Sequence, residues 1–248
     1  FNMKRGFFSS SNMRRALSYL IDRTYIVETI MSGGGEEAFV PTAKKTPAVE
    51  SVASQFSHSP EIVKEMLGAA AVSDYDNDGW VEYMSGNVPV KFTVKFIVNK
   101  DNPVKLAAAE NIAKAMRELQ INVELHKLSW EDYVSALERG DFDMYYAEVK
   151  LTADFDLSKL LFRNGELNYG GINDSAYEIL INAYLSADES LRETAAEALY
   201  NDIASTAPIV PIAFRRQAML TKRGVVTGAR PSASGVFNDI AAWTVDLG

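Results

Sequence analysis

Residues 90–149 constrain the fold most, because segments with a strand pattern alternate there with segments that have a helix pattern. Strand patterns show alternating apolar and polar residues, and helix patterns begin at capping residues and end at glycine or a polar turn. These segments follow one another in the order 90–98, 102–119, 121–128, 129–140 and 142–149. Strand–helix–strand units of this length predict right-handed crossovers and a largely parallel sheet.

The chain before this stretch reads mainly as helix. One helix is predicted over 9–31, with Ser and Asn at its start and three consecutive glycines as its stop. Residues 36–57 contain two prolines and many small polar residues, which predicts a surface loop. A second helix is predicted from Ser59-Pro60-Glu61, with Ser as the cap and Pro in the first turn. Its expected buried stripe consists of Ile62, Val63, Met66 and Leu67.

The chain after this stretch adds helices and one short strand. Helices are predicted near 157–162, 174–186 and 188–206, and a strand at a sheet edge over 208–214. Residues 222–248 are weakly patterned. The predicted fold class is therefore α/β, with a mixed, mostly parallel sheet flanked by helices.

Composition excludes several classes of function. The chain has 248 residues, a net charge of -8 and no cysteine. An acidic surface disfavours nucleic acid and anionic lipid, and the lack of thiols removes disulfides and zinc–thiolate sites. No apolar run approaches the ~18 residues that span a bilayer. The start at Phe1 lacks the apolar stretch of a signal peptide, so we expect a chain cut from something longer, with any export signal upstream.

An acidic loop at 74–82 resembles a calcium-binding loop in part. Aspartates occupy positions 1, 3 and 5 and glycine position 6, as in an EF-hand. The twelfth position, which should be a glutamate, is Ser85, and a strand follows in place of a helix. A polar turn before a strand is the favoured interpretation, and weak cation binding stays open.

Catalytic equipment is sparse. The two histidines, His58 and His126, are far apart in sequence and lack a third ligand at metal spacing. Carboxylate pairs at 141/143 and 154/156 could share a proton, but most such pairs are solvated. The chain lacks a glycine-rich phosphate loop that opens a helix. We therefore expect no enzyme, no catalytic residue, no cofactor and no metal site.

Two loops are candidates for binding a small ligand. Residues 148–156 lie at the C-terminal end of the third predicted strand, and ligands of open α/β sheets bind at the carboxyl ends of the strands. This loop offers both signs of charge, a hydroxyl and exposed backbone. Residues 164–171 contain glycines that permit close backbone approach. The alternative for both is an ordinary loop with solvated charges.

Four stretches resemble the family 5 extracellular solute-binding proteins, the peptide and nickel receptors of ABC importers. They are residues 12–23, 140–144, 151–156 and 207–211, and the match spans almost the whole chain. The resemblance implies a type II periplasmic-binding-protein-like lobe, the second lobe of a receptor that closes on an extended peptide. Residues 1–248 would form this single lobe, with 1–8 and about 230–248 as crossover segments toward a missing first lobe.

The resemblance also implies the ligand-binding positions. Dipeptide-binding relatives clamp the amine of the ligand with an Asp and its carboxylate with an Arg, and these positions align with Leu151 and Asn99. Since neither can form the ion pair, a dipeptide held at both ends is not expected. The candidate ligand-binding residues are Asn99, Glu148, Lys150, Leu151, Thr152, Asp154, Asn168, Tyr169 and Gly170.

The function that the resemblance implies is capture of oligopeptides, or a related small solute, for delivery to an ABC permease. We expect a monomer, extracellular or periplasmic, anchored through a lipid on the missing N-terminus. A ligand-sensing regulatory module with the same fold is the alternative.

Overall fold

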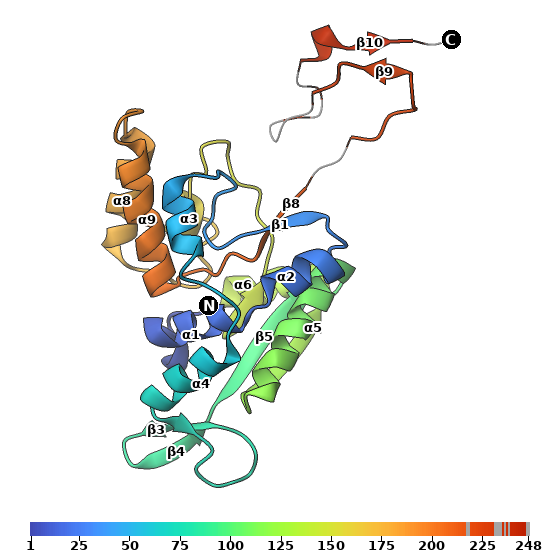
Figure 1. The fold of residues 1–248 in the computed structure, drawn as a ribbon. Coiled ribbons are helices and arrows are strands. Elements are labelled where there is room, and N and C mark those ends of the chain that lie inside the picture. The colour runs from blue at the N-terminus through green and yellow to red at the C-terminus, as the bar shows by residue number, and fades with distance from the viewer. Residues whose placement is uncertain (217–218, 231–234, 236, 238, 247–248) are drawn as a thin grey trace.

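The computed structural model describes residues 1–216, 219–230, 235, 237 and 239–246. Its central element is a three-stranded parallel sheet in the order β6-β5-β7 (Figure 1). These strands are β5 (Thr93–Asn99), β6 (Asn122–Leu128) and β7 (Met144–Tyr146). Phe96 of β5 lies opposite Leu125 of β6 and Met144 of β7. The predicted α/β class and the parallel pairing of these three segments are confirmed.

Helices cover both faces of this sheet. Along β5, Val94, Phe96 and Val98 belong to the main core, whereas Ile97 faces a second cluster with Tyr133. Since side chains alternate along a strand, each face of β5 is buried by a different helix. The helices are α5 (Pro103–Glu118), capped by Asn102, and α6 (Trp130–Arg139), capped by Ser129.

The strand predicted over 90–98 is two strands. β4 (Val88–Lys91) pairs with β3 (Glu82–Ser85), which pairs with β2 (Val72–Ser73), in a separate antiparallel sheet. The chain changes partners at Phe92, which is buried and packs its ring on Phe7. Alternation cannot reveal such a change, because the period is the same on both sides. β7 is also shorter than the predicted 142–149.

The helix predicted over 9–31 is interrupted. A 3-10 turn, η1 (Gly6–Ser9), precedes α1 (Ser11–Leu20), which ends at an extended Ile21. Asp22 then caps a new start by accepting a hydrogen bond from the Tyr25 amide. α2 (Arg23–Tyr25) continues as a π-helix, η2 (Ile26–Ile30).

The predicted loop over 36–57 contains regular structure. β1 (Gly35–Glu37) pairs antiparallel with β8 (Ala213–Arg215), which occupies only the end of the strand predicted over 208–214. α3 (Pro47–Ala53) begins at Thr46, whose hydroxyl accepts from the Val49 amide. A Thr cap followed by Pro in the first turn is typical of a helix start. The two prolines were therefore wrongly interpreted as a sign of a loop throughout 36–57.

The remaining helices pack on α1 or on one another. They are α4 (Pro60–Ala69), α7 (Ser158–Leu161), α8 (Ser175–Ser186) and α9 (Arg192–Thr206), close to their predicted bounds. Val63 and Leu67 of α4 are buried, but Ile62 is 36% exposed, so the predicted stripe is narrower. Within the described residues, no helix is long and apolar enough to cross a membrane.

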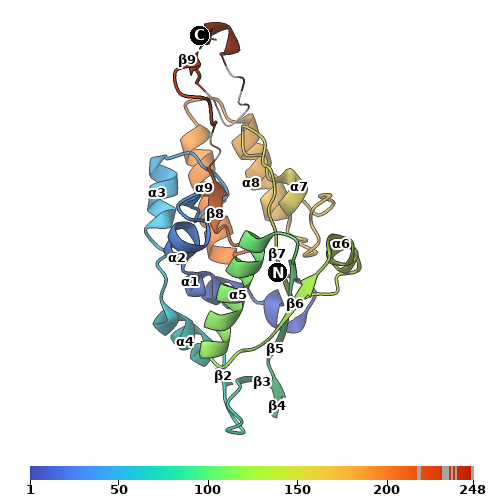
Figure 2. The ribbon, with the colours of Figure 1, turned by 90° about the vertical axis from the view of Figure 1, so that its right-hand side faces the viewer.

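The C-terminal segment stands apart from the body in both views (Figures 1 and 2). β9 (Val226–Thr227) pairs antiparallel with β10 (Thr244–Val245), and a 3-10 turn, η3 (Ile240–Ala242), lies between them. Residues 1–8, in contrast, lie against the sheet, where the Asn2 amide donates to the Asp143 carbonyl. The crossover role expected for 1–8 and about 230–248 stays a prediction, and part of the second segment lies outside the described residues.

Two buried arginines join α1 and α2 to the segment after α9. Arg14 donates to the carbonyls of Phe8, Ser9, Thr206 and Ala207 over 2.7–3.1 Å. Arg23 donates to the carbonyls of Ala38, Pro211 and Ser18 over 2.9–3.3 Å. Burial lowers the pKa of Arg23 to about 10, so the guanidinium stays charged at neutral pH.

We expect Arg14→Lys to lower the free energy of unfolding by at least ~2 kcal/mol. A lysine carries one compact ammonium in place of the guanidinium fork, so buried carbonyls of both segments lose their donors. Urea unfolding followed by circular dichroism measures the change. The same substitution at the exposed Arg163 should change stability by less than ~0.5 kcal/mol. Equal effects at the two positions would contradict the role assigned to Arg14.

Candidate functional site

The carboxyl ends of the parallel strands form the candidate site. Asn99 ends β5, Leu128 ends β6, and Glu148 follows β7 by two residues. Because the strands are parallel, these three positions lie at the same edge of the sheet. The sheet holds them on a rigid base, since β5 is paired with β6 along all seven of its residues.

Glu148 pairs with two cations at this edge. One of its carboxylate oxygens lies 3.1 Å from the Lys105 ammonium, and the other lies 3.8 Å from the Arg215 guanidinium. Its side chain is still 47% exposed. The neighbouring Tyr146 has its pKa raised to about 12, chiefly by burial and also by the negative charge of Glu148. The edge therefore offers a carboxylate and two cations, which come from α5, the end of β7 and β8.

Asn99 supports the turn that follows β5. Its side-chain oxygen accepts a 2.7 Å hydrogen bond from the Asp101 amide. Asp101 in turn accepts a 3.1 Å hydrogen bond from the Trp130 amide at the start of α6. These two bonds fix the turns after β5 and β6 relative to each other.

The loop after β7 is held by short-range bonds. The Thr152 hydroxyl accepts from the Asp156 amide at 3.0 Å, and Asp156 accepts from the Ser158 amide at 2.8 Å. The Thr152 hydroxyl also hydrogen-bonds the Asp154 carboxylate and so holds the pKa of Asp154 below its usual range. Lys150 and Asp154 are exposed, and Leu151 packs partly against the core. The loop thus presents exposed charges on a fixed backbone.

Residues 168–170 lie elsewhere. The Asn168 side chain bonds the carbonyls of Phe162 and Ile172 and the amide of Ile172. The Gly170 carbonyl accepts from the Met3 amide. The preceding residue, Asn2, donates its amide to the carbonyl of Asp143, which directly precedes β7. Glu148 follows the other end of that strand, and in the described part of the chain no hydrogen bond or ion pair joins residues 148–156 to residues 168–170.

Tyr169 lines an open hollow of about 540 Å³ beside this second loop, together with Asn2, Arg5 and Arg139. The contacts of Asn168 and Gly170 favour a structural role for the loop. Their ligand-binding role stays a prediction.

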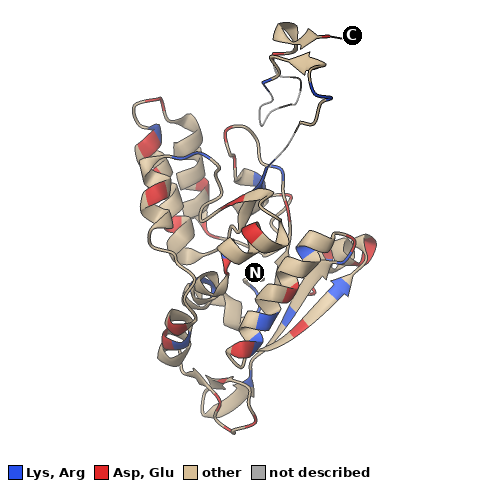
Figure 3. Cartoon of the chain, turned by 45° about the vertical axis from the view of Figure 1, so that its right-hand side comes forward, with Lys and Arg blue, Asp and Glu red and all other residues tan. Residues whose placement is uncertain are grey.

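Several charged residues at the edge were missed by the sequence reasoning. Glu36 of β1 lies 3.3 Å from Arg216 and 3.8 Å from Lys45, and Lys44 lies over the Phe155 ring. Charges of both signs gather around β1 and β8 (Figure 3). The signal for this cluster in the sequence is the pair Arg215 and Arg216 after an apolar run. Their partners, Glu148 and Glu36, are distant in sequence, so the pair alone does not predict the contacts.

The other titratable candidates are paired with nearby groups. Asp141 lies 2.7 Å from Lys95, which lowers the pKa of Asp141, and Asp143 accepts from the Lys95 amide. His58 lies 4.0 Å from Asp22, and His126 lies 3.4 Å from Glu124. These pairs are typical of surface electrostatics, and each histidine lies beside a single carboxylate.

Comparison with known proteins gives one family. The model of the bacterial extracellular solute-binding proteins, family 5 Middle, matches residues 1–157. The oligopeptide-binding protein AppA of Bacillus subtilis is 26% identical over 145 residues, which are 57% of this chain and 26% of AppA. Heme-binding protein A of Haemophilus influenzae is 23% identical over 188 residues, 73% of this chain and 32% of that protein. The chain thus spans about a quarter to a third of these relatives.

Solved structures confirm the fold. AppA in complex with a nonapeptide has a TM-score of 0.77 at 20% identity, with 99% of this chain and 49% of that chain covered. A mannohexaose-bound oligopeptide-binding protein of Thermotoga maritima has a TM-score of 0.78 at 19% identity, with 96% and 47% covered. The predicted type II periplasmic-binding architecture is therefore confirmed.

Gly170→Ala should destabilise the protein by at least ~2 kcal/mol, because a Cβ there would lie 2.3 Å from the Phe1 carbonyl oxygen. Thermal unfolding by circular dichroism measures the loss. Gly68→Ala in α4 is the matched control, since nothing lies within 4 Å of its Cβ and alanine favours helix by up to ~1 kcal/mol. A Gly170→Ala variant as stable as the parent would contradict the close packing of Gly170 against Phe1.

Proposed function

This chain belongs to the bacterial extracellular solute-binding proteins of family 5, and we propose that it forms one lobe of a receptor that captures oligopeptides or a related small solute. The captured ligand lies between two lobes and is delivered to a membrane permease. The observation that carries the proposal is the charged edge at the carboxyl end of the sheet, where Glu148 meets Lys105 and Arg215. This family consists of solute-binding proteins, so reversible capture is proposed in preference to catalysis.

The ligand surface of the proposal comprises Asn99, Glu148, Lys150, Leu151, Thr152 and Asp154. Residues 147–150 are exposed and belong to no strand, so their backbone could pair with an extended peptide as an added strand. The charges on either side could then bind polar side chains or the ends of the ligand. AppA was solved with a nonapeptide and the Thermotoga relative with mannohexaose, which supports a peptide or another extended solute of similar size.

Leu151 and Asn99 argue against a dipeptide within this proposal. Leu151 is apolar and partly packed in the core, and the Asn99 oxygen is engaged with the Asp101 amide. A ligand clamped only by its two charged ends would find neither ion-pair partner at positions 151 and 99. We therefore propose a ligand longer than a dipeptide, bound mainly through its backbone.

The location and partners are part of the same proposal. A monomeric receptor outside the cytoplasmic membrane, anchored by a lipid and paired with an ABC permease, fits the family. The alternative is a ligand-sensing regulatory module with the same fold. The sequence encoded upstream distinguishes them: a signal peptide with a lipid-attachment cysteine supports the receptor, and a helix-turn-helix domain supports the regulator.

The 248-residue chain alone should bind peptides more weakly than about 1 μM, because one lobe leaves half of the ligand in water. Isothermal titration calorimetry against peptide mixtures measures this affinity. Submicromolar binding would show that the missing first lobe is not needed for capture. Mass spectrometry of ligands that co-purify with the complete receptor identifies the solute.

In the complete receptor, Glu148→Gln and Asp154→Asn should each weaken binding of that solute about tenfold, equivalent to ~1.4 kcal/mol. The loss arises because each substitution removes a charge at the proposed ligand surface and keeps the shape of the side chain. Glu118→Gln, an exposed position on α5 that pairs with Lys114, is the matched control. Unchanged affinity in both edge variants would exclude this edge as the ligand surface.

A further inference from the structure

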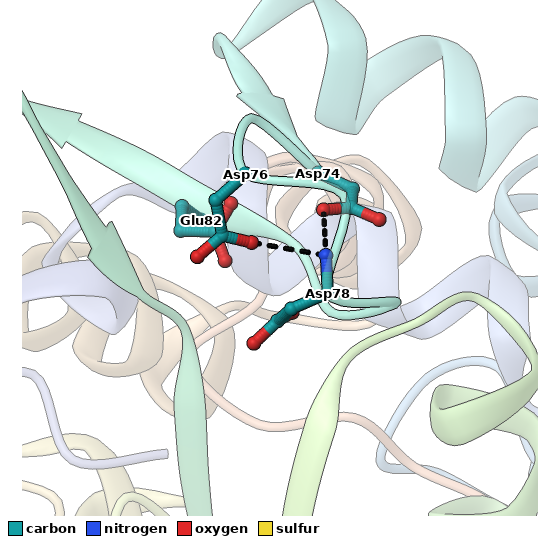
Figure 4. A group of neighbouring side chains, drawn as sticks. All are labelled: Asp74, Asp76, Asp78 and Glu82. Carbon is teal, nitrogen blue, oxygen red and sulfur yellow. Dashed lines mark hydrogen bonds between the residues drawn. The ribbon is translucent and has the colours of Figure 1, made fainter.

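Four carboxylates meet in the turn between β2 and β3. They belong to Asp74, Asp76, Asp78 and Glu82, and one oxygen from each lies within 4.8 Å of the others (Figure 4). The three aspartates come from the turn, and Glu82 is the first residue of β3. Like charges at this separation repel one another, so the arrangement needs a counter-charge.

Glu82 is the unusual member of this group. It is only 3% exposed, and its Oε2 accepts a 2.8 Å hydrogen bond from the Tyr75 amide. Its Oε1 is buried and has no hydrogen-bond partner in the described part of the chain. A buried carboxylate oxygen without a partner costs ~1–3 kcal/mol or more, and such an atom calls for a missing ligand.

The backbone of the turn fixes the aspartates. The two oxygens of Asp74 accept from the amides of Asp78 and Gly79 at 3.1 and 3.0 Å, and Asp76 also accepts from the Asp78 amide. Gly79 has a φ of +93°, which favours glycine at this position. These bonds hold the turn in place, and one oxygen of each of the four carboxylates remains within 4.8 Å of the others.

The local cations do not balance the charge. In the described residues, the ammonium that pairs with this group is that of Lys91, which bonds Asp78 and thereby lowers the pKa of Asp78. Lys91 lies opposite Glu82 in the β3–β4 pairing, yet it bonds Asp78 and not Glu82. One lysine against four carboxylates leaves room for a divalent cation.

We propose that residues 74–82 bind a calcium ion through the carboxylates of Asp74, Asp76, Asp78 and Glu82. All four donors are hard oxygens without histidine or cysteine, which suits Ca²⁺ and disfavours zinc or copper. Glu82, nine positions into the loop, supplies the carboxylate that an EF-hand takes from its twelfth position. The antiparallel turn brings Glu82 back to the aspartates. In an EF-hand, the helix after the loop places the glutamate there.

The site lies far from the proposed ligand surface. Lys91 is two residues before β5 begins, whereas Asn99 is where β5 ends, so the length of the strand, ~20 Å, separates them. The bound ion would stabilise the β2–β3–β4 sheet, whose Tyr83 contacts the ring of Phe7. Its loss should therefore change stability and leave the ligand edge intact, and this prediction is independent of the solute-binding proposal.

The test is isothermal titration calorimetry of the chelator-treated chain with calcium chloride, with magnesium chloride as the comparison. We expect one site with a Kd on the order of 10⁻⁴ M for Ca²⁺ and weaker binding of Mg²⁺. At about 10 mM Ca²⁺ the midpoint of thermal unfolding should rise by roughly 5–10 °C. Terbium luminescence excited through Trp80, which lies within the loop, gives a second readout.

Glu82→Gln should weaken Ca²⁺ binding at least tenfold and reduce the thermal shift at 10 mM Ca²⁺ to about half or less. Asp76→Ala changes an exposed residue, so it serves as the test if Glu82→Gln fails to fold. It should weaken Ca²⁺ binding to the same extent. Glu118→Gln, remote on α5, is the matched control and should bind as the parent does. Absence of Ca²⁺ binding by the parent at 10 mM, or parental affinity in the loop variants that fold, would overturn the proposal.

Discussion

The hydrogen bonds of Arg14 and Arg23 to backbone carbonyls are the interactions on which the architecture depends. Neither guanidinium forms an ion pair in the described part of the chain, yet both are at least 94% buried. Their donors meet the carbonyls of the segment after α9 and those around the start of α1. Since an unsatisfied buried guanidinium would be very costly, these hydrogen bonds strongly favour the observed packing of the two segments. The stretches 12–23 and 207–211, two of those that carry the family resemblance, are thus one structural unit.

The sequence was informative where the signals of an element are local. α5 and α6 were predicted closely because Asn102 and Ser129 cap them and Gly140 ends the second. The interruption at Ile21–Asp22 was not predicted, since apolar spacing continues through it and the break depends on the distant carbonyls that Arg23 reaches. The partner change at Phe92 depends in the same way on tertiary contact with Phe7.

The candidate site also has one part that the sequence predicts and another part that depends on tertiary contacts. Parallel topology places Asn99 and Glu148 at one edge, and that placement follows from the order of the elements alone. The cations beside Glu148 come from α5 and β8, and no spacing rule links Lys105 or Arg215 to it. Glu82 was overlooked for a related reason: the loop template expects its glutamate three residues later, and only the antiparallel pairing of β3 shows that this one reaches the aspartates.

The position of the exposed loop after β7 has an evolutionary consequence. Residues 147–154 contribute little to the core, whereas β5, α5 and α9 each contribute several buried side chains. For the solute-binding role proposed above, substitutions in the loop would alter which solute is accepted at small cost in stability, since exposed positions usually change stability by less than ~0.5 kcal/mol. A scaffold organised in this way can diversify its specificity by drift at a few surface positions, without waiting for compensatory changes in its interior.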